Sequence, residues 1–359
     1  MKTVLVCPLN WGIGHATRCV PVISKFSENG FKVVIAADGH PLEFLKKEFP
    51  SSQFIKFPGV RITYPENSRF ALRMCLLTPK FILGIIREHR MLKKIIKQEN
   101  IDIVVSDNRY GLWNRGKFSI LITHQLNIHL PGTLKLLSGI IRKINNSLIR
   151  KFDECWIPDF ELHRGLAGKL SHPDNLPSNA VYIGALSRFS FGSTHFRQAI
   201  PIQYDIIAVL SGPEPQRSIF EEKILYQLKS TDLRGIVIRG LIDSNESYYL
   251  TENIRVFSHL DTQQLKGDML GSEVVICRSG YSSIMDIVTI GKRAIFIPTP
   301  GQTEQEYLAH YMMDKKIFFA MPQADFDLLY ALEMAKNFPG MVMQNDYQIL
   351  EERIRLLNN

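Results

Sequence analysis

The chain of 359 residues contains no long hydrophobic run. A membrane-spanning helix needs about 20 mainly apolar residues, so none is predicted. The amino-terminal sequence MKTVLVCPLNWGIGHATR has a very short apolar run that passes into glycines without a small-residue cleavage site, which predicts a first strand and no signal peptide. We therefore expect a cytoplasmic protein.

Cysteine is scarce, and long low-complexity stretches that would favour disorder are lacking. The cysteines form no CxxC pair, which argues against a zinc site and indicates unpaired thiols in a reducing compartment. Apolar residues make up 45% of the chain, and its length exceeds that of one ordinary core, so two α/β domains are expected. The five cysteines are Cys7, Cys19, Cys75, Cys155 and Cys277.

Positive charge is concentrated in the first half. Residues 1–165 hold 25 Lys and Arg against 13 Asp and Glu, a net charge of +12, whereas residues 166–359 hold 18 against 22, a net charge of −4. Two basic stretches, Arg69–Lys97 and Lys135–Lys151, also carry many large apolar residues. We expect them to dock on an anionic membrane surface, although a core helix with a solvated basic face is the alternative. Nucleic acid is not an expected partner, because no binding motif for it occurs.

Short runs rich in Val and Ile alternate with amphipathic stretches throughout. Near-continuous hydrophobicity is typical of strands buried on both faces, and the alternation indicates right-handed βαβ units around parallel sheets. The expected strands are Thr3–Cys7, Lys32–Ala36, Gln53–Phe57, Ile101–Ser106, Ser119–Thr123, Glu154–Ile157, Ala180–Ile183, Tyr204–Leu210, Gly235–Arg239, Ile254–Phe257, Glu273–Cys277, Arg293–Ile297 and Ile317–Ala320.

The strand pattern restarts at Tyr204 after a polar, irregular stretch. We therefore predict two doubly wound Rossmann-like domains, 1–190 and 203–340, followed by a C-terminal helix within 341–359 that packs back on the first domain. Ligands of such sheets bind at the carboxyl ends of the strands, here across a cleft between the domains.

A glycine turn, LNWGIGHATR, follows the first strand. Its glycines permit a tight turn and close approach of a ligand, and the next helix offers free N–H groups. A dinucleotide site is disfavoured because the third glycine of that fingerprint is missing, and a turn with a capping histidine is the alternative. Polar residues at other strand ends of this half join the candidate site. The candidates are Gly12, Gly14, His15, Arg18, Asp107 and His124.

The second half carries two further turns after strands. In LSGPEPQR, Ser211 and Gly212 can offer a hydroxyl and an N–H group to a phosphate, or form an ordinary βα turn. The stronger signal is RSGYSS, which begins at Arg278 and opens a helix that can bind a diphosphate. Asp286 follows on the second turn of that helix, where its carboxylate can accept from ribose hydroxyls. The loop PTPGQTEQE then presents side chains suited to sugar hydroxyls; a capped helix and a plain polar loop are the alternative.

The run VVICRSGYSSIMDIVTIGKRAIFIPTPGQTEQEY resembles the donor-binding signature of MurG-type UDP-GlcNAc transferases, which have a glycosyltransferase family 28 C-terminal domain. GIGHATR is similar to the N-terminal glycine loop of the same family. The resemblance implies the GT-B fold, with the acceptor on the first domain and the nucleotide sugar on the second. It implies inverting transfer of a hexose from a UDP-sugar, which is a co-substrate and no cofactor, to a sugar or other hydroxyl acceptor. The basic stretches add the expectation of a lipid-linked acceptor and of peripheral attachment to the inner face of the cytoplasmic membrane.

The resemblance also implies roles for matching residues. His15 would face the acceptor hydroxyl as general base. Asp286 replaces the usual Glu as the ribose ligand, and Glu306 replaces a glutamine that reads the hexose, so the sugar stays open among GlcNAc, Gal and Glc types. The expected donor-binding residues are Ser211, Gly212, Arg278, Ser279, Gly280, Tyr281, Ser282, Asp286, Gln302, Gln305 and Glu306.

Asp325-Phe326-Asp327 imitates a metal-binding DxD motif. It lies beyond the donor loop, at the expected start of a helix, where acidic residues are favourable. We therefore predict no obligatory metal. Other hypotheses are a nucleotide-sugar epimerase of GT-B shape and a nucleotide-sugar-binding protein without turnover.

Overall fold

The computed structural model describes residues 1–59, 70–128, 138–161, 165–190, 201–343 and 347–358, with side chains left undescribed at 70–82. The chain forms two compact units. Among the described residues, unit 1 comprises those up to Arg188 and those from 347 onward, and unit 2 comprises those from Phe189 to 343.

Unit 1 is built on a seven-stranded sheet in the order β3-β2-β1-β4-β5-β6-β7. Every neighbouring pair is parallel. The central strands β1 and β4 are buried along their whole length, as expected for strands covered on both faces. The strands are β1 (Thr3–Cys7), β2 (Lys32–Ala37), β3 (Gln53–Lys56), β4 (Ile103–Asp107), β5 (Phe118–Ile122), β6 (Glu154–Ile157) and β7 (Ala180–Tyr182).

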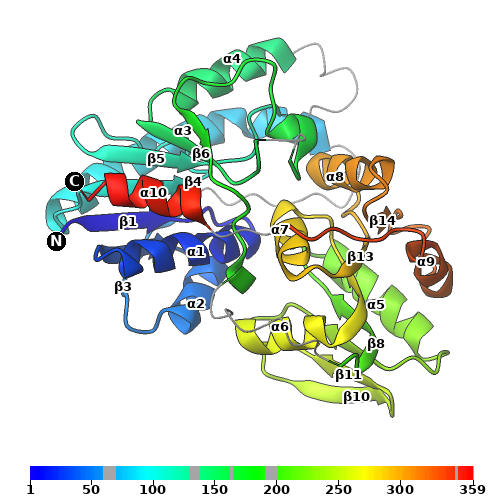
Figure 1. The fold of residues 1–359 in the computed structure, drawn as a ribbon. Coiled ribbons are helices and arrows are strands. Elements are labelled where there is room, and N and C mark those ends of the chain that lie inside the picture. The colour runs from blue at the N-terminus through cyan, green and yellow to red at the C-terminus, as the bar shows by residue number, and fades with distance from the viewer. Residues whose placement is uncertain (60–69, 129–137, 162–164, 191–200, 344–346, 359) are drawn as a thin grey trace. The chain divides into compact units, whose positions relative to one another are not determined.

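Helices cover both faces of this sheet (Figure 1). One face packs against α3, through a cluster that joins Leu92 and Ile96 to Leu5 and Val104 of the strands. The other face carries α1, against which α2 and α10 pack. The helices are α1 (Gly14–Glu28), α2 (Gly39–Glu48), α3 (Phe70–Gln98), α4 (Ser138–Ile149) and α10 (Gln348–Leu356), with a 3-10 turn at Gly168–Leu170.

Unit 2 has its own seven-stranded sheet, in the order β10-β11-β9-β8-β12-β13-β14. The strands pair in parallel except for the β10–β11 hairpin at one edge. The strands are β8 (Tyr204–Val209), β9 (Gly235–Ile238), β10 (Ser247–Thr251), β11 (Ile254–Phe257), β12 (Ser272–Cys277), β13 (Arg293–Phe296) and β14 (Phe319–Ala320). The helices are α5 (Gln216–Leu228), α6 (Thr262–Leu270), α7 (Tyr281–Ile290), α8 (Thr303–Asp314) and α9 (Leu328–Ala335), and a 3-10 turn spans Arg188–Ser190.

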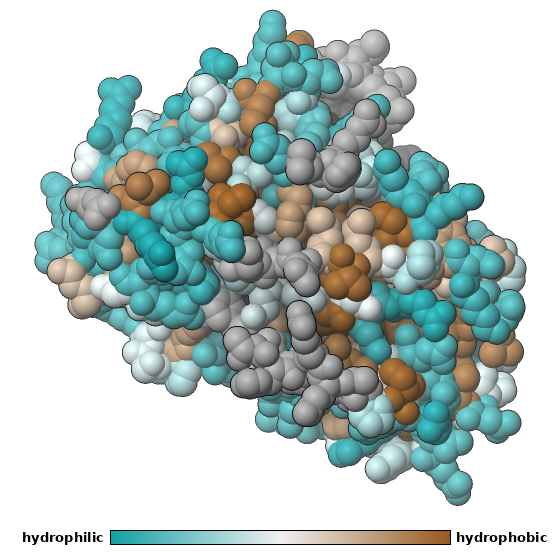
Figure 2. All heavy atoms as spheres, in the orientation of Figure 1, coloured by the Kyte–Doolittle hydropathy of each residue, from teal (hydrophilic) through white to brown (hydrophobic). Residues whose placement is uncertain are grey.

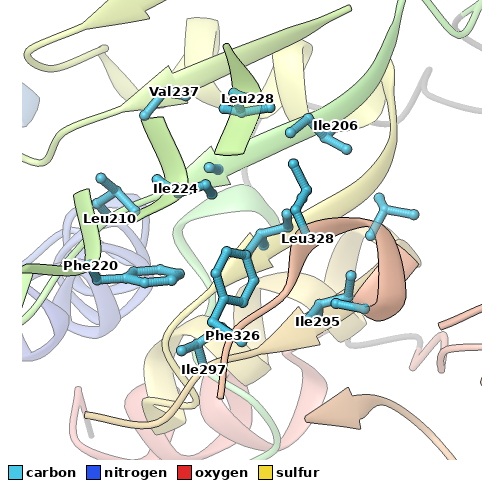
Figure 3. Packing of buried hydrophobic residues seen from close by; sticks show 14 of the residues in the cluster. Ile206, Leu210, Phe220, Ile224, Leu228, Val237, Ile295, Ile297, Phe326 and Leu328 are labelled. Carbon is cyan, nitrogen blue, oxygen red and sulfur yellow. The ribbon is translucent and has the colours of Figure 1, made fainter. Parts of the chain in front are cut away.

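The core of unit 2 lies between the sheet and helices α5 and α9 (Figure 3). Phe220 of α5 and Phe326 before α9 meet edge to face, with their ring centroids 5.2 Å apart. Ile206, Ile295 and other branched residues of the strands fill the opposite side. This packing fixes where β8 and β13 end, and therefore where their loops emerge.

The predicted pair of Rossmann-like α/β domains with parallel sheets is confirmed. Each predicted strand is present with ends within two residues of the expected ones. The exception is β10, which the sequence did not predict. Its residues Ser247–Thr251 are exposed or half-buried at the sheet edge, so they lack the continuous hydrophobicity of the inner strands. On the molecular face in Figure 2, hydrophilic residues dominate and hydrophobic ones lie among them in small groups.

Candidate functional site

In unit 1, the first strand leads into α1 through a glycine turn at the carboxyl edge of the sheet. Gly12 has a φ of 75°, a backbone conformation that glycine adopts readily and other residues rarely. Helix α1 begins at Gly14, so His15 and Arg18 lie one turn apart on the same helix face. The sequence therefore places a histidine and an arginine side by side at the end of β1.

Asp107 is the last residue of β4, the strand beside β1, and it is fully buried. Its Oδ2 atom is 2.7 Å from Nδ1 of His15. Its Oδ1 atom accepts a hydrogen bond from Nε of Arg18 over 2.6 Å and forms an ion pair with Nη2 over 2.5 Å. Burial raises the pKa of the Asp107 carboxyl, but the Arg18 guanidinium and the His15 ring outweigh it and hold the pKa below its ordinary value. Asp107 is therefore an anion at neutral pH.

The position of His15 suits proton transfer. Nδ1 lies 2.7 Å from Asp107 and 2.8 Å from Nη2 of Arg18. In the tautomer that carries its proton on Nδ1, His15 donates that proton to Asp107, and Nε2 has a lone pair that can accept a proton; in the other tautomer, Nδ1 accepts from Arg18. The side chain is 14% exposed, in contrast to its buried partners. A carboxylate behind one ring nitrogen is an arrangement that makes the other nitrogen a general base.

His124 completes the cluster predicted for this edge. It follows β5, is buried, and its Nδ1 lies 3.4 Å from Nη1 of Arg18. The structure thus brings His15, Arg18, Asp107 and His124 together from three neighbouring strand ends.

A buried ion pair that the sequence did not predict holds the loop after Asp107. Arg109 donates from Nη2 to Oε1 of Glu88 over 2.8 Å and from Nη1 to the carbonyl of Phe57 over 3.3 Å. Its guanidinium also lies 4.2 Å from the centre of the Phe57 ring. Burial raises the pKa of Glu88 even though Arg109 opposes the shift. The sequence did not predict that Glu88 is buried, because a single acidic residue in a basic amphipathic helix is usually on the surface.

In unit 2, the turn after β8 makes a close approach to the loop after β13. Gly212 has a φ of 109°, in the region that favours glycine. A Cβ atom on Gly212 would lie 3.4 Å from Oγ1 of Thr299. Thr299 is buried, and its hydroxyl has no hydrogen-bond partner within the described structure. The predicted phosphate turn at Ser211 and Gly212 is therefore adjacent to the predicted sugar loop.

The turn after β12 opens α7, with Gly280 at the N-cap. The hydroxyl of Ser279 is buried and donates to the carbonyl of Gln305 over 2.8 Å. Tyr281 is buried, Ser282 is half-buried, and Asp286 lies buried on the second turn of the helix. The N–H groups at this helix start are not capped by a side chain of Gly280, which has none.

The loop between β13 and α8 is held by the first turn of its own helix. Oε1 of Gln305 accepts from the backbone N of Thr299 over 2.8 Å, and Oε1 of Glu306 accepts from the N of Gly301 over 2.9 Å. Gln302 is the N-cap residue of α8. The Nε2 atom of Gln305 lies 3.9 Å from the position of a Cβ on Gly280, so the sugar loop and the α7 turn are neighbours.

Arg278 is placed differently from a residue that reaches toward a ligand. It is 1% exposed, and its guanidinium donates to backbone carbonyls of neighbouring loops. Burial lowers its pKa to about 10.

The DxD-like string is part of a helix start. Asp327 is the N-cap residue of α9, and its carboxylate accepts from the backbone N of Tyr330 over 2.9 Å. In the described part of the chain, no group of three or more His, Cys, Asp or Glu side chains is arranged to hold a metal ion. Among the same residues, no helix combines the length and apolar character that crossing a bilayer requires.

Comparison with known proteins gives consistent matches. Residues 207–337 match the model of the glycosyltransferase family 28 C-terminal domain. The chain is 24% identical over 346 residues to a UDP-N-acetylglucosamine--N-acetylmuramyl-(pentapeptide) pyrophosphoryl-undecaprenol N-acetylglucosamine transferase of Sulfurihydrogenibium sp., covering 94% of this chain and 90% of that protein. It is 22% identical over 318 residues to an uncharacterized glycosyltransferase of Methanosarcina acetivorans, covering 82% and 79%.

Among solved structures, MurG of Acinetobacter baumannii is similar in fold, with a TM-score of 0.54 and 13% sequence identity, covering 99% of this chain and 95% of that one. The segment 207–337 contains all the loops of unit 2 described above, from the β8 turn to the start of α9.

Proposed function

We propose that the chain is a MurG-like glycosyltransferase of GT-B fold that transfers a hexose from a UDP-sugar to an acceptor hydroxyl, with inversion and without a metal ion; the family 28 match, the similar relatives and the similar fold support this. The observation that carries this proposal is the contact between His15 and Asp107 at the carboxyl edge of the unit 1 sheet. It supplies a base of the kind that activation of a hydroxyl needs.

In the proposed step, the acceptor oxygen attacks the anomeric carbon as the bond from that carbon to the diphosphate breaks. Nε2 of His15 takes the proton of the hydroxyl, and Asp107 stabilises the imidazolium that forms. The electron pair of the broken bond leaves with UDP. We assign stabilisation of the charge that develops on the diphosphate to the N–H groups at the start of α7, a form of stabilisation that needs no metal. A single displacement of this kind inverts the anomeric centre.

We assign the donor to unit 2. Asp286 is the proposed ribose ligand, and the turns at Ser211–Gly212 and Ser279–Gly280 the proposed diphosphate contacts. For the hexose, Gln305 and Glu306 each keep polar atoms beyond the Oε1 that binds their own loop. The second carboxylate oxygen of Glu306 only accepts, so it suits the hydroxyls of a neutral hexose.

The acceptor is proposed to be lipid-linked and reached at an anionic membrane surface. On α4, Ile140 and Ile144 are 58% and 56% exposed, one turn apart, and Arg142 and Lys143 beside them are exposed. On α3, Leu83 is 66% exposed and is followed by exposed basic residues. Large apolar side chains among cations are typical of helices that lie on anionic bilayers. Residues 135–137, the first residues of the second basic stretch, lie outside the described residues.

A ligand panel tests the proposed function. The purified chain is heated with UDP, UDP-GlcNAc, UDP-Gal, UDP-Glc, GDP-mannose or NAD, beside an Asp286→Asn variant. Ligand at about a hundred times its dissociation constant should raise the free energy of unfolding by about 2.7 kcal/mol. We expect a response to UDP and to one UDP-sugar that the variant loses. A response to NAD alone, or to no nucleotide, would refute the UDP-sugar assignment.

Vesicle binding tests the membrane assignment. Flotation with vesicles of anionic and of neutral lipid should recover the protein with the anionic ones only, and less at high salt. An Ile140→Glu/Ile144→Glu double variant should lose this binding, whereas Tyr248→Glu/Tyr249→Glu, on the exposed edge strand β10 of unit 2, should retain it. Equal recovery of the two variants would contradict the assignment to α4.

A further inference from the structure

Arg278 follows β12 directly, and its side chain is enclosed by backbone. Nη2 donates to the carbonyl of Gln216 over 2.8 Å, and Nη1 to the carbonyl of Ile297 over 3.1 Å. Longer contacts reach the carbonyl of Pro298 from Nη1, at 3.4 Å, and that of Ser211 from Nε, at 3.4 Å. The plane of the guanidinium lies over the Phe220 ring, 4.7 Å from its centre.

The four carbonyls belong to three separate segments. Ser211 lies in the turn after β8, Gln216 is the first residue of α5, and Ile297–Pro298 is the end of the segment that β13 starts. The sheet does not join the β8 and β13 segments directly, because both strands neighbour β12 and not each other. Arg278, at the end of that middle strand, links the loops on either side.

The chemistry of the guanidinium suits this task. Its five N–H groups form a rigid planar fork, and the four contacts can occupy four of them. Turning the fork toward a diphosphate would remove these bonds and leave buried carbonyls without partners, which is unfavourable. The same burial lowers the pKa of Arg278, yet leaves the group charged at neutral pH.

We propose that Arg278 is a positioning residue, which holds the β8–α5 turn and the β13–α8 loop together so that their donor-binding groups face each other. The close approach of Gly212 to Thr299 is the result, since a Cβ on Gly212 would lie 3.4 Å from the Thr299 hydroxyl and 3.9 Å from Nε of Arg278. This inference rests on the proposed function only for the identity of the ligand that the two loops bind. Under it, Arg278 acts through the loops and does not contact the diphosphate itself, in contrast to the donor-binding role expected from the sequence.

Two full-length variants test the proposal. Arg278→Lys keeps the charge but loses the fork, and Arg278→Gln loses the charge but keeps a planar pair of donors. Hydrogen–deuterium exchange should rise in peptides that cover 211–217 and 297–302 in both variants, while peptides of β1 in unit 1 stay unchanged. Calorimetry should show that UDP and uridine lose affinity by the same factor, because loop position serves both ligands.

The opposite pattern overturns the proposal. If Arg278 contacts the diphosphate, Arg278→Gln should weaken UDP binding at least about tenfold more than uridine binding, with local exchange unchanged and with Arg278→Lys largely active. Unchanged exchange and unchanged affinities would overturn it too.

A measurement on the wild-type chain decides the matter if neither variant folds. With nitrogen-15-labelled arginine, the Nε–H signal of Arg278 should exchange slowly without ligand and shift equally with uridine and with UDP. A larger shift with UDP would overturn the proposal. If the wild type binds neither ligand, the proposed function fails, while the exchange data still decide whether Arg278 fixes the two loops.

Discussion

Substitution of Asp107 by asparagine changes one oxygen of the buried carboxyl into an NH2 group and keeps its shape. In the wild type, Oδ1 accepts from Arg18 and Oδ2 faces Nδ1 of His15 at 2.7 Å. Two nitrogens of the charged Arg18 contact Oδ1, so the remaining amide oxygen should stay with Arg18. The new NH2 group then faces Nδ1 and can only donate. His15 is thereby held with its proton on Nε2, the tautomer that cannot accept the proton of an acceptor hydroxyl.

The expected loss follows from the role of the base. General base catalysis contributes about 10²–10⁴-fold, and a histidine held in the wrong tautomer loses that contribution, so kcat should fall by about 10³, or about 4 kcal/mol. Removal of the anion also leaves the buried Arg18 charge without compensation, which should lower the free energy of unfolding by about 3 kcal/mol. Because the folded pKa of Asp107 is lowered, its contribution to stability is present above the ordinary aspartate pKa and is lost as the pH falls through the lowered value.

The assay follows UDP release from the UDP-sugar that responds in the ligand panel, with the acceptor it supports. The matched control is Asp102→Asn. Asp102 precedes β4 at its opposite end, where it accepts from the backbone N of Thr3 over 2.9 Å and from Lys117 over 3.2 Å. That variant should keep its kcat, and both variants should bind UDP as the wild type does. A kcat in Asp107→Asn within about tenfold of the control would refute the assignment of His15 and Asp107 as base and partner.

Three further outcomes are expected. Glu88→Ala should lower the free energy of unfolding in urea by about 3–5 kcal/mol, because Arg109 stays buried without its carboxylate; a loss below about 1 kcal/mol would contradict this. The pKa of Glu88 is raised in the folded state. The stabilisation that comes from its protonation is therefore complete below the ordinary glutamate pKa and is lost as the pH rises through the raised value. Urea titrations at several pH values should show this decline in the wild type and not in Glu88→Gln. Gly212→Ala should lower the free energy of unfolding by about 1–3 kcal/mol and weaken UDP binding, since the φ of Gly212 is 109°. The control Gly267→Ala, whose new Cβ has no atom within 4 Å, should be neutral or stabilising. Equal effects of the two variants would argue against strain at Gly212.

The inner strands could be predicted from sequence because strands buried on both faces consist of continuous runs of apolar residues. The five residues of β1 are all buried, and the predicted bounds match the observed ones. The edge strand β10 has no such run, since its residues Tyr248 and Tyr249 are exposed and it pairs with β11 at the edge of the sheet. A hairpin at a sheet edge needs neither continuous hydrophobicity nor helical cover.

Strand order explains why the candidate site residues of unit 1 could be predicted from the sequence, whereas their contacts with one another could not. Polar residues at strand ends were identifiable, and parallel strands end at the same edge of the sheet. That β1 and β4 are neighbours, which brings His15 to Asp107, is a property of topology that local patterns do not contain. The Glu88–Arg109 pair shows the same limit, because its members come from α3 and from the loop after β4 and meet only in the folded chain.

Arg278 shows why a motif can locate a site without assigning the work of each residue. RSGYSS after a buried strand indicated an anion-binding helix start, and an arginine at its first position suggested contact with the anion. That inference assumes that the strongest cation faces the ligand, yet a cation beneath a loop can also bind carbonyls that the turns leave unpaired. The choice depends on where the loops after β8 and β13 pass. Once these loops lie on either side of β12, their carbonyls accept hydrogen bonds from Arg278.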